Sequence, residues 1–481
     1  MARRCTFLAL LTVSGSLLAQ SPQREPRSVA ATSPRAGVAP KAESSNPPVL
    51  VNTSKLPKTV EVNITAAVTT LTLQPGLKSE VFAYNGSVPG PTLDVREGDH
   101  VIVHFRNDLP EPTTVHWHGI HLPFESDGSP FHPIKPGETH DYEFTVRPGT
   151  AGTYWYHPHP DHRTGFAIGK GLFGGIVVHA ANDPLPPMPD KLIILSDNRF
   201  LKDGMIDFPD PMSHHGGVDE ENGREGPVLF VNGQVMPVIS IRSGEVQRWR
   251  IVNGSAGRIY RIALPGHSFL QVGTDGGLFE KPVEVKDILL TTGERVEVLV
   301  RGTDPPGTKS ILKNLPYDRY APQTRPTDWE TTRDLLTLQT TDEAPVTPVA
   351  IPATLRKIAP LDPARSTAVR TVVFSQGLIN GKAMDMTRVD VSTTVGATEI
   401  WEIENIVGMD HPFHLHGFQF QVLDRDGVAE PYRAWKDMLN IPKHTSARII
   451  VRYDDYPGKW MFHCHILDHE DHGMMGVLEV K

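Results

Sequence analysis

Only two cysteines occur among the 481 residues, Cys5 and Cys464. Because Cys5 falls in a segment that we expect to be removed, Cys464 is left alone and an internal disulfide is excluded. Beyond the N-terminus there is no apolar run long enough to cross a bilayer, which excludes a membrane span. An excess of positive charge is also missing, and the formal net charge of -9 argues against a nucleic-acid partner.

The first 19 residues have the pattern of a secretory signal. An arginine pair opens the segment, an apolar core runs to Leu18, and small residues end near Ala19. The pair followed by Phe7 is similar to a twin-arginine signal. We therefore expect an exported protein, periplasmic or secreted, with a buried N-terminal helix as the alternative. Residues 20–48 are rich in Pro, Ser and Ala and predict a disordered linker.

The glycine and proline content is too high for a mainly helical protein. The chain has 41 glycines and 43 prolines, which fit many short strands separated by turns. Runs such as HVIVHF, THDYEFTV and EVQRWRIV alternate apolar and polar residues with a period of two. This alternation is typical of half-buried antiparallel strands. The sequence therefore predicts an all-β fold built from β-sandwiches.

An internal repeat divides the chain into three copies. Each copy opens on Asn-Gly, continues to a second glycine, has an asparagine nine residues later, and shows two comparable positions nine and eleven residues after that. The landmarks are Asn85, Gly98, Asn107, His116 and His118 in copy one; Asn232, Gly244, Asn253, Ile262 and Leu264 in copy two; and Asn380, Gly396, Asn405, His414 and His416 in copy three. We expect the three domains at residues 49–182, 183–345 and 346–481. Copy two has apolar residues in place of the histidines, and we interpret it as a spacer between the other two.

The ends of copies one and three also match each other. GTYWYHPH, residues 152–159, aligns with GKWMFHCH, residues 458–465, so that His157 and His159 correspond to His463 and His465. His-x-His on a strand points both imidazoles to the same face. If copies one and three pack together, four such pairs bring eight imidazoles to one place. That number is too large for one ion and suits a cluster of about three.

Cys464 lies between two of these histidines, so its sulfur points to the opposite face of the strand. There it can bind a different metal, together with His469 and with His411, three residues before His414. Met474 is a candidate weak axial ligand. Two histidines, one cysteine and a distant methionine form the trigonal set of blue-copper electron-transfer sites, whereas a zinc site would more often use several cysteines or no methionine.

Four motifs carry a resemblance to a known family. HWHG (116–119), HPH (157–159), HPFHLHG (411–417) and HCHILDHEDHGMM (463–475) resemble the copper signatures of the multicopper oxidases, in the bacterial laccase-like and copper-efflux branch. The resemblance covers about residues 50–481 and implies three tandem cupredoxin-like Greek-key β-sandwich domains with four copper ions, one of type 1, one of type 2 and two of type 3. The ligands that it implies are His411, Cys464, His469 and axial Met474 for type 1; His116 and His414 for type 2; His118, His157 and His465 for one type 3 copper; and His159, His416 and His463 for the other.

The resemblance also implies a reaction. A reductant gives electrons singly to type 1 copper, and the three-copper cluster reduces dioxygen to water with four electrons. Because this reduction consumes protons in a buried site, carboxylates are needed close by. Asp127 and Glu470 match the family's acidic positions, and we expect them to relay protons. The alternative for Asp127 is to cap a turn before glycine.

The reducing substrate is less sharply defined by the sequence. A long methionine-rich insert, as in the cuprous oxidases of this branch, is missing between about residues 310 and 390, and Val407 stands where an aspartate near Met409 would help to bind substrate copper. We therefore expect a laccase-like enzyme with an open type 1 edge that oxidises phenols or other aromatic compounds. Oxidation of cuprous or other metal ions in periplasmic copper tolerance is the alternative. Asp410 is either an acceptor for a phenol or a plain surface carboxylate, and His214-His215 belong to a copper-transit site or to a flexible polar loop.

Two other interpretations fit the sequence poorly. A copper-free scaffold of this fold would have lost ligands, whereas all ten histidines and the cysteine of the copper motifs are present. A two-domain nitrite reductase builds its catalytic copper site between subunits, whereas this chain carries both halves of the histidine cluster itself. Domain packing within one chain is compatible with a monomer, which is the expected state.

Overall fold

The computed structural model describes residues 46–481, so the predicted signal at 1–19 and most of the predicted linker lie outside the described residues. The prediction of disorder is wrong for the last three residues of that linker, 46–48, which make hydrogen bonds to the folded chain. The Asn46 side chain bonds to Asp190 O and Leu192 N, and Pro48 O accepts from Thr92 N. Within the described part of the chain, no helix has both the length and the apolar character needed to cross a membrane.

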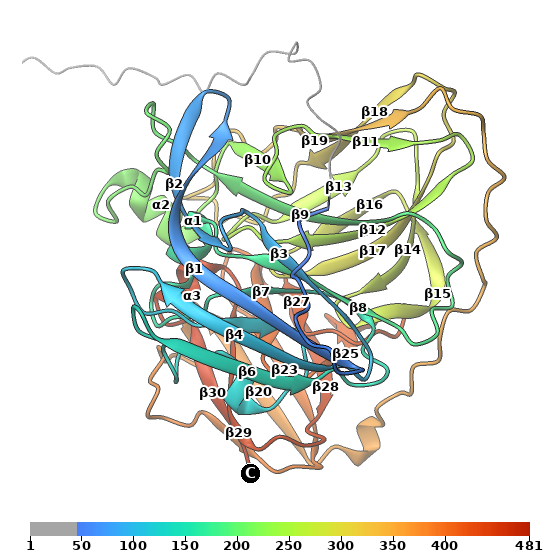
Figure 1. The fold of residues 1–481 in the computed structure, drawn as a ribbon. Helices are drawn as coiled ribbons and strands as arrows, with labels where there is room; N and C mark the ends of the chain where they lie inside the picture. The colour runs from blue at the N-terminus through green and yellow to red at the C-terminus, as the bar shows by residue number, and fades with distance from the viewer. Residues whose placement is uncertain (1–45) are drawn as a thin grey trace, which may run out of the picture. The chain divides into compact units, whose positions relative to one another are not determined.

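Residues 59–179 form two four-stranded sheets, with strand orders β2-β1-β4-β6 and β3-β8-β7-β5. Their apolar faces enclose one core, to which Ile64, Tyr142 and Tyr156 contribute. The elements, blue to green in Figure 1, are β1 (Thr59–Gln74), β2 (Leu77–Tyr84), β3 (Gly90–Arg96), β4 (His100–Asp108), β5 (His116–His118), the 3-10 helix η1 (Phe124–Ser126), β6 (Thr139–Thr145), β7 (Gly152–His157), α1 (Thr164–Lys170) and β8 (Gly174–His179).

Residues 190–340 form a six-stranded sheet, β10-β9-β12-β17-β14-β15, and a five-stranded sheet, β11-β19-β18-β13-β16. Trp249, Tyr260 and Val298 belong to the core between them. The elements are β9 (Asp190–Asn198), α2 (His214–Asn222), β10 (Val228–Val231), β11 (Val238–Ile241), β12 (Val246–Asn253), β13 (Tyr260–Ala263), β14 (Phe269–Thr274), β15 (Gly277–Val285), β16 (Asp287–Leu290), β17 (Arg295–Arg301), β18 (Lys309–Leu315) and β19 (Arg333–Thr340).

Residues 368–480 repeat the pattern with a six-stranded sheet, β21-β20-β23-β28-β25-β26, and a five-stranded sheet, β22-β30-β29-β24-β27. Trp401, Trp460 and Phe462 fill the core between them. The elements are η2 (Pro363–Arg365), β20 (Ala368–Ser375), β21 (Leu378–Ile379), β22 (Val391–Thr393), β23 (Thr398–Asn405), β24 (His411–Leu415), β25 (Phe420–Arg425), β26 (Val428–Ala429), β27 (Met438–Ile441), β28 (Ser446–Arg452), β29 (Gly458–Cys464), α3 (Leu467–Asp471) and β30 (Met475–Val480).

The all-β prediction is confirmed, and each pair of sheets lies inside one of the three predicted segments, whose boundaries stay a prediction. The first long strand of each pair runs parallel to the strand that carries the nine-residue asparagine: β1 with β4, β9 with β12, and β20 with β23. Asn85, Asn232 and Asn380 all have positive φ, between 48° and 51°. Each of these side chains accepts from a main-chain N–H of that first strand and donates to the carbonyl two residues earlier.

A second asparagine in each copy holds the loop that leads to the candidate ligand strand. The side chains of Asn107, Asn253 and Asn405 are buried, and each donates to at least two main-chain carbonyls. In copy three these carbonyls are those of Met409, just before β24, and of Ile441 and Pro442, at the end of β27, which pairs with β24. The repeated asparagine therefore fixes the loops from which the two histidine-bearing strands, β5 and β24, begin.

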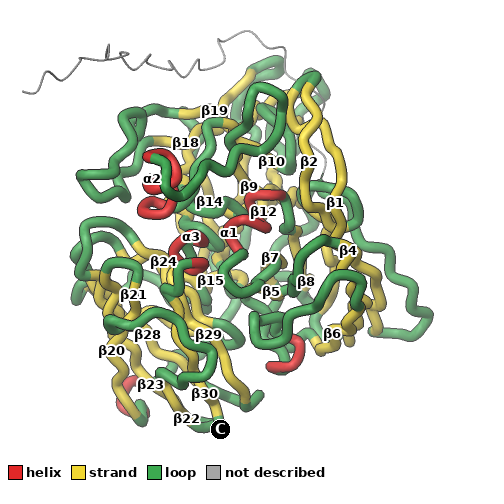
Figure 2. The backbone as a smooth tube through the Cα atoms, turned by 90° about the vertical axis from the view of Figure 1, so that its left-hand side faces the viewer, coloured by secondary structure: helices red, strands yellow, loops and turns green. Residues whose placement is uncertain are grey.

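Within residues 46–481, three short α-helices lie among the strands, and α1 and α2 both pack on α3 (Figure 2). The prediction of a flexible polar loop around His214-His215 is wrong, because α2 begins at His214. The Ser213 side chain accepts from Gly216 N at the start of this helix, and Asn222 at its end exchanges two hydrogen bonds with Thr324. These capping and tertiary contacts order a segment whose polar, glycine-containing sequence does not by itself favour a helix.

Candidate metal centres

Four strands bring the predicted His-x-His pairs to adjacent positions. In copy one β5 pairs with β7, so that His116 lies opposite His157. In copy three β24 pairs with β29, so that His414 lies opposite His463. Because alternate residues of a strand share a face, these pairings aim the imidazoles of each copy the same way.

The histidines of copies one and three meet in one buried group, which we call the eight-histidine site: His116, His118, His157, His159, His414, His416, His463 and His465. Rings from the two copies stack with centroids 3.9 Å apart, His116 on His416 and His118 on His414. Nε2 of His416 lies 3.1 Å from Nε2 of His463. Copies one and three therefore pack together, which is the condition under which the sequence predicts that the eight imidazoles converge.

Within this site, possible ligand atoms lie within 4.8 Å of one another in several sets of three. Two sets are the proposed type 3 ligand groups, and a third adds His118 to the proposed type 2 pair. These sets are His118, His157 and His465; His159, His416 and His463; and His116, His118 and His414. The geometry brings together every histidine that the sequence singles out, while their role as metal ligands stays a prediction.

Hydrogen bonds determine which ring nitrogen of each histidine faces the centre. His116, His157, His414 and His463 each donate Nδ1–H to a main-chain carbonyl at 2.9–3.0 Å, which leaves the Nε2 lone pair free. Among residues 46–481, Nε2 of His116, His414 and His465 finds no hydrogen-bond partner. Buried polar atoms are nearly always paired, so inward-facing lone pairs without partners fit a bound metal.

Burial also keeps these rings neutral, as metal coordination requires. Burial first, and then the neighbouring imidazoles, hold the pKa values of His157, His159, His414 and His463 well below the usual range. The site thus offers several uncharged nitrogen donors in a space from which water is largely excluded. Imidazole donors of this kind suit copper.

The second candidate centre, the Cys464 site, consists of His411, Cys464, His469 and Met474. Nδ1 of His411 lies 3.3 Å and Nδ1 of His469 lies 3.7 Å from the Cys464 sulfur, and the two Nδ1 atoms are 3.3 Å apart. Met474 is fully buried, and its main chain bonds to those of Cys464 and His469. The sulfur and two nitrogens form the trigonal face expected of a blue-copper centre.

The two predicted proton-relay carboxylates both touch the eight-histidine site. Asp127 Oδ2 lies 3.0 Å from His416 Nδ1, so its side chain faces the histidines and does not cap a turn. Glu470, on α3, has its oxygens 3.4 Å from His159 Nε2 and 3.2 Å from His463 Nδ1. Their contacts place both carboxylates beside the proposed ligands.

The environments of the two carboxylates push their pKa values apart. Burial acts to raise the pKa of Asp127, but His416 and His116 together hold it below its usual value. Burial, and then Asp471, raise the pKa of Glu470 well above its usual value. The two buried carboxyl groups thus differ in the direction of their pKa shifts, a difference that is common where protons are handled.

Two expectations about the substrate side are wrong. Asp410 is buried, so it is not a surface carboxylate. It is not a free acceptor for a phenol either, because its carboxylate already accepts hydrogen bonds from Tyr317, Asn440 and Lys443. The type 1 edge is not open, because α2 covers it and His469 Nε2–H donates to Glu221 O at 2.9 Å. Met409 is also buried.

Sequence reasoning missed Asp437 and Arg295. Asp437 contacts His118 through its carboxylate and His414 through its main-chain carbonyl, and it pairs with Arg295 from copy two. The only signal in the sequence was a charged pair, Lys436-Asp437, next to the apolar β27. Their connection spans copies that are distant in the chain, so no local spacing could reveal it.

Comparison with known proteins identifies the family. Family profiles described as multicopper oxidase match residues 65–183, 148–333 and 355–481. The multicopper oxidase mco of Staphylococcus aureus is 32% identical, with 84% of this chain and 84% of that protein covered. The chain belongs to the multicopper oxidase family. This multicopper oxidase is accordingly a copper-dependent oxidoreductase that uses dioxygen.

Solved structures of other multicopper oxidases confirm the cupredoxin-like fold. The multicopper oxidase from Campylobacter jejuni, described as a metallo-oxidase, superposes with a TM-score of 0.83 at 33% identity, covering 92% of this chain and 96% of that one. The laccase from Pediococcus acidilactici superposes with a TM-score of 0.81 at 31% identity, covering 92% and 95%. The chain is thus similar both to a structure described as a metallo-oxidase and to one described as a laccase.

Proposed function

We propose that this multicopper oxidase is laccase-like, taking single electrons from phenolic or aromatic compounds at the Cys464 site. The observation that carries the choice of reductant is a cavity of about 430 Å³ beside that site. Its size lies within the range of pockets that hold small organic molecules. The two candidate centres and the path between them support the rest of the proposal.

In this proposal the Cys464 site holds type 1 copper and the eight-histidine site holds type 2 copper and the type 3 pair, with the ligand sets given above. When bound, these four copper ions supply one-electron oxidation of the reductant and four-electron reduction of dioxygen to water. The main chain connects the two proposed centres, because Cys464 is covalently linked to His463 and His465 of the eight-histidine site. The sulfur and its neighbouring imidazoles face opposite sides of β29, one towards each centre.

Asp127 and Glu470 are proposed to supply the protons that this reduction consumes. Glu470 contacts one histidine from copy one and one from copy three, and Asp127 bonds to His416 and His116. Both carboxylates therefore reach the eight-histidine site without belonging to the proposed ligand sets. Their role is to hold and pass protons at the oxygens that face the site.

The cavity lies next to the chain segment that bonds to His469. Its walls include Asn222 and Gly223, which directly follow Glu221, and Glu221 O accepts the hydrogen bond from His469 Nε2. The cavity wall is therefore continuous along the chain with the residue that bonds to a proposed type 1 ligand. The aromatic side chains in the wall are Tyr317, Tyr320 and Trp329, which suit contact with a flat organic molecule.

The same cavity is a poor site for cuprous ion. None of its lining residues is methionine or cysteine, the soft donors that Cu(I) prefers. Among residues 46–481, the sets of three His, Cys, Asp or Glu ligands all fall in the two centres already described. Metal-ion oxidation remains the second candidate, because His214 and His215 also line the cavity and the similar Campylobacter jejuni structure is described as a metallo-oxidase.

Oxygen uptake by the copper-loaded full-length chain tests the choice, with a methoxyphenol and Cu(I) compared side by side. We expect faster uptake with the phenol and no need for added copper. Val218→Trp, on the cavity side of α2, should lower kcat/KM for the phenol, whereas Val428→Trp at an exposed position on β26 should not. Dominant Cu(I) oxidation that falls in a His214→Ala/His215→Ala double variant would replace the proposal with the metal-ion oxidase.

A further inference from the structure

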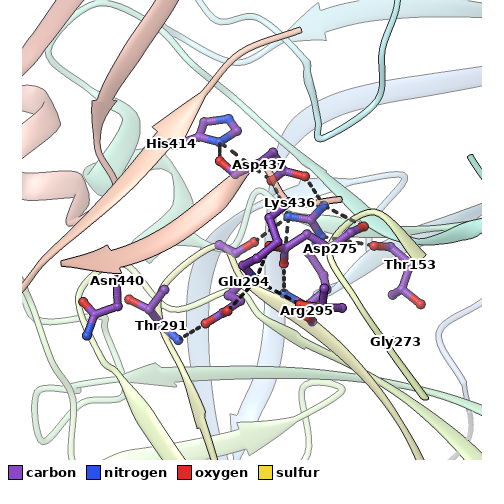
Figure 3. A network of polar contacts seen from close by, with 12 residues as sticks. Thr153, Gly273, Asp275, Thr291, Glu294, Arg295, His414, Lys436, Asp437 and Asn440 are labelled. Atoms are coloured by element: carbon purple, nitrogen blue, oxygen red, sulfur yellow. Dashed lines mark hydrogen bonds and ion pairs between the residues drawn. The ribbon is translucent and has the colours of Figure 1, made fainter. Parts of the chain in front are cut away.

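A buried ion pair connects copy two to the eight-histidine site (Figure 3). Arg295 begins β17, and Asp437 directly precedes β27; the side chains are 0% and 1% exposed. The sequence assigns copy two only the role of a spacer. This ion pair gives it a direct connection to the proposed copper ligands.

Each of the three nitrogens of the Arg295 guanidinium donates hydrogen bonds to buried oxygen atoms. Its two terminal nitrogens donate to the two Asp437 carboxylate oxygens at 2.6 and 2.5 Å, a bidentate geometry that the planar fork of arginine allows. It also donates to the main-chain oxygens of Thr153, Asp275 and Gly293, each at 3.1 Å. Arg295 is therefore held by copies one, two and three at once.

Asp437, which belongs to copy three, in turn bonds to one histidine from copy one and to one from copy three. Its Oδ1 lies 3.1 Å from His118 Nε2, and its main-chain carbonyl accepts Nδ1–H of His414 at 2.9 Å. With Nε2–H engaged, the lone pair of His118 is on Nδ1, which lies 3.3 Å from His157 Nε2. For His414 the lone pair is on Nε2, which faces into the site.

Two neighbouring residues, Lys436 and Gly119, help to keep Asp437 beside Arg295. The preceding residue, Lys436, bonds through Nζ to Asp275, Glu294 and Thr274 of copy two, at 2.7–2.9 Å. On the other side lies Gly119 of the HWHG motif, with φ +85°; a Cβ there would overlap both Arg295 and Asp437. The glycine of that motif thus makes room for the ion pair.

We propose that Arg295 and Asp437 are positioning residues, which hold His118 and His414 in the ring orientations that present Nδ1 and Nε2 to copper. The proposal rests on the proposed function, since it takes these histidines as ligands. Residues that orient metal-bound histidines commonly affect metal affinity by about 10- to 100-fold. Asp437 acts on a proposed type 3 ligand and a proposed type 2 ligand together, so its loss should affect the whole cluster.

The test compares three variants of the full-length chain. Asp437→Asn removes the charge that pairs with Arg295, and Arg295→Lys keeps the positive charge but removes the bidentate fork. Glu297→Gln is the matched control, because Glu297 is also fully buried, pairs with Arg248 and Arg250, and bonds to Thr153 of copy one without touching a proposed ligand. Each variant is measured for copper affinity, the EPR signal of type 2 copper, the blue absorbance of type 1 copper, and the temperature of unfolding.

We expect Asp437→Asn and Arg295→Lys to weaken copper binding at the cluster by about 10- to 100-fold, with loss of the type 2 signal and retention of the blue absorbance. Glu297→Gln should lower the unfolding temperature but keep both signals. Wild-type copper affinity in Asp437→Asn and Arg295→Lys, or copper loss in all three variants in proportion to their unfolding temperatures, would overturn the proposal. If Asp437→Asn does not fold, Arg295→Lys decides the question. A wild-type chain without any type 2 signal would instead overturn the proposed function.

Discussion

Replacing Cys464 by serine should separate the two candidate centres. Cys464 is fully buried at the end of β29, and its sulfur accepts a long 3.5 Å hydrogen bond from Ile466 N while facing His411 and His469. Serine has nearly the same shape, but its hydroxyl is not ionised near neutral pH and offers no thiolate. We therefore expect the type 1 centre to be lost while the eight-histidine site still binds copper.

The effect of this substitution on folding should be small. A buried hydroxyl without a partner costs about 1–3 kcal/mol in free energy of unfolding, and here His411 Nδ1 lies close enough to the sulfur position to accept a hydrogen bond. We expect a loss of no more than about 1–2 kcal/mol for a hydroxyl that keeps a partner. Chemical denaturation of the copper-free proteins measures this difference.

In contrast to this small effect on stability, the Cys464→Ser substitution should abolish oxidase activity. The loaded Cys464→Ser protein should lose its blue absorbance and one copper ion, keep the type 2 EPR signal, and consume oxygen with a methoxyphenol only at the background rate. Retained oxidase activity, or a retained blue band, would refute the assignment of Cys464. Loss of both centres together with the fold would refute the claim that they are separate sites.

Three further substitutions test other parts of the account. Glu470→Gln should slow reoxidation of the fully reduced protein by dioxygen in rapid mixing while type 1 reduction by substrate keeps its rate; unchanged reoxidation would reject the proton role. Met474→Leu should raise the potential of the blue centre in a redox titration, since the axial ligand tunes it, and Met475→Leu, the adjacent buried methionine, should leave it unchanged. Gly119→Ala should reduce copper occupancy and lower the unfolding temperature, because the new Cβ meets Arg295 and Asp437 at a positive φ that itself costs roughly 1–2 kcal/mol; wild-type copper content would show that the ion pair can shift freely.

The histidine and cysteine positions could be predicted because local rules determine them. Strand alternation decides that His463 and His465 share a face and that Cys464 points away. The repeat then aligns His116 with His414, and the buried asparagines at nine-residue spacing give both copies the same start for the ligand strand. These relations depend on spacing along the chain, which a single sequence displays directly.

The parts that could not be predicted depend on contacts between distant segments. Helix α2 forms because Ser213 caps it and Asn222 bonds to Thr324, about a hundred residues away. Its position over His469 closes an edge that the sequence led us to expect open. Arg295 and Asp437 likewise belong to different copies, and neither lies in a recognisable motif, so only the folded chain shows that they meet beside His118.

Copper content and spectra of the loaded full-length chain test the central claim most directly. The account predicts four copper ions per chain, a blue absorbance from the Cys464 site, and a type 2 EPR signal from the eight-histidine site. Binding of fewer ions without a blue band or a type 2 signal would contradict it, and would mean that the buried imidazoles and the Cys464 sulfur do not form the centres proposed here.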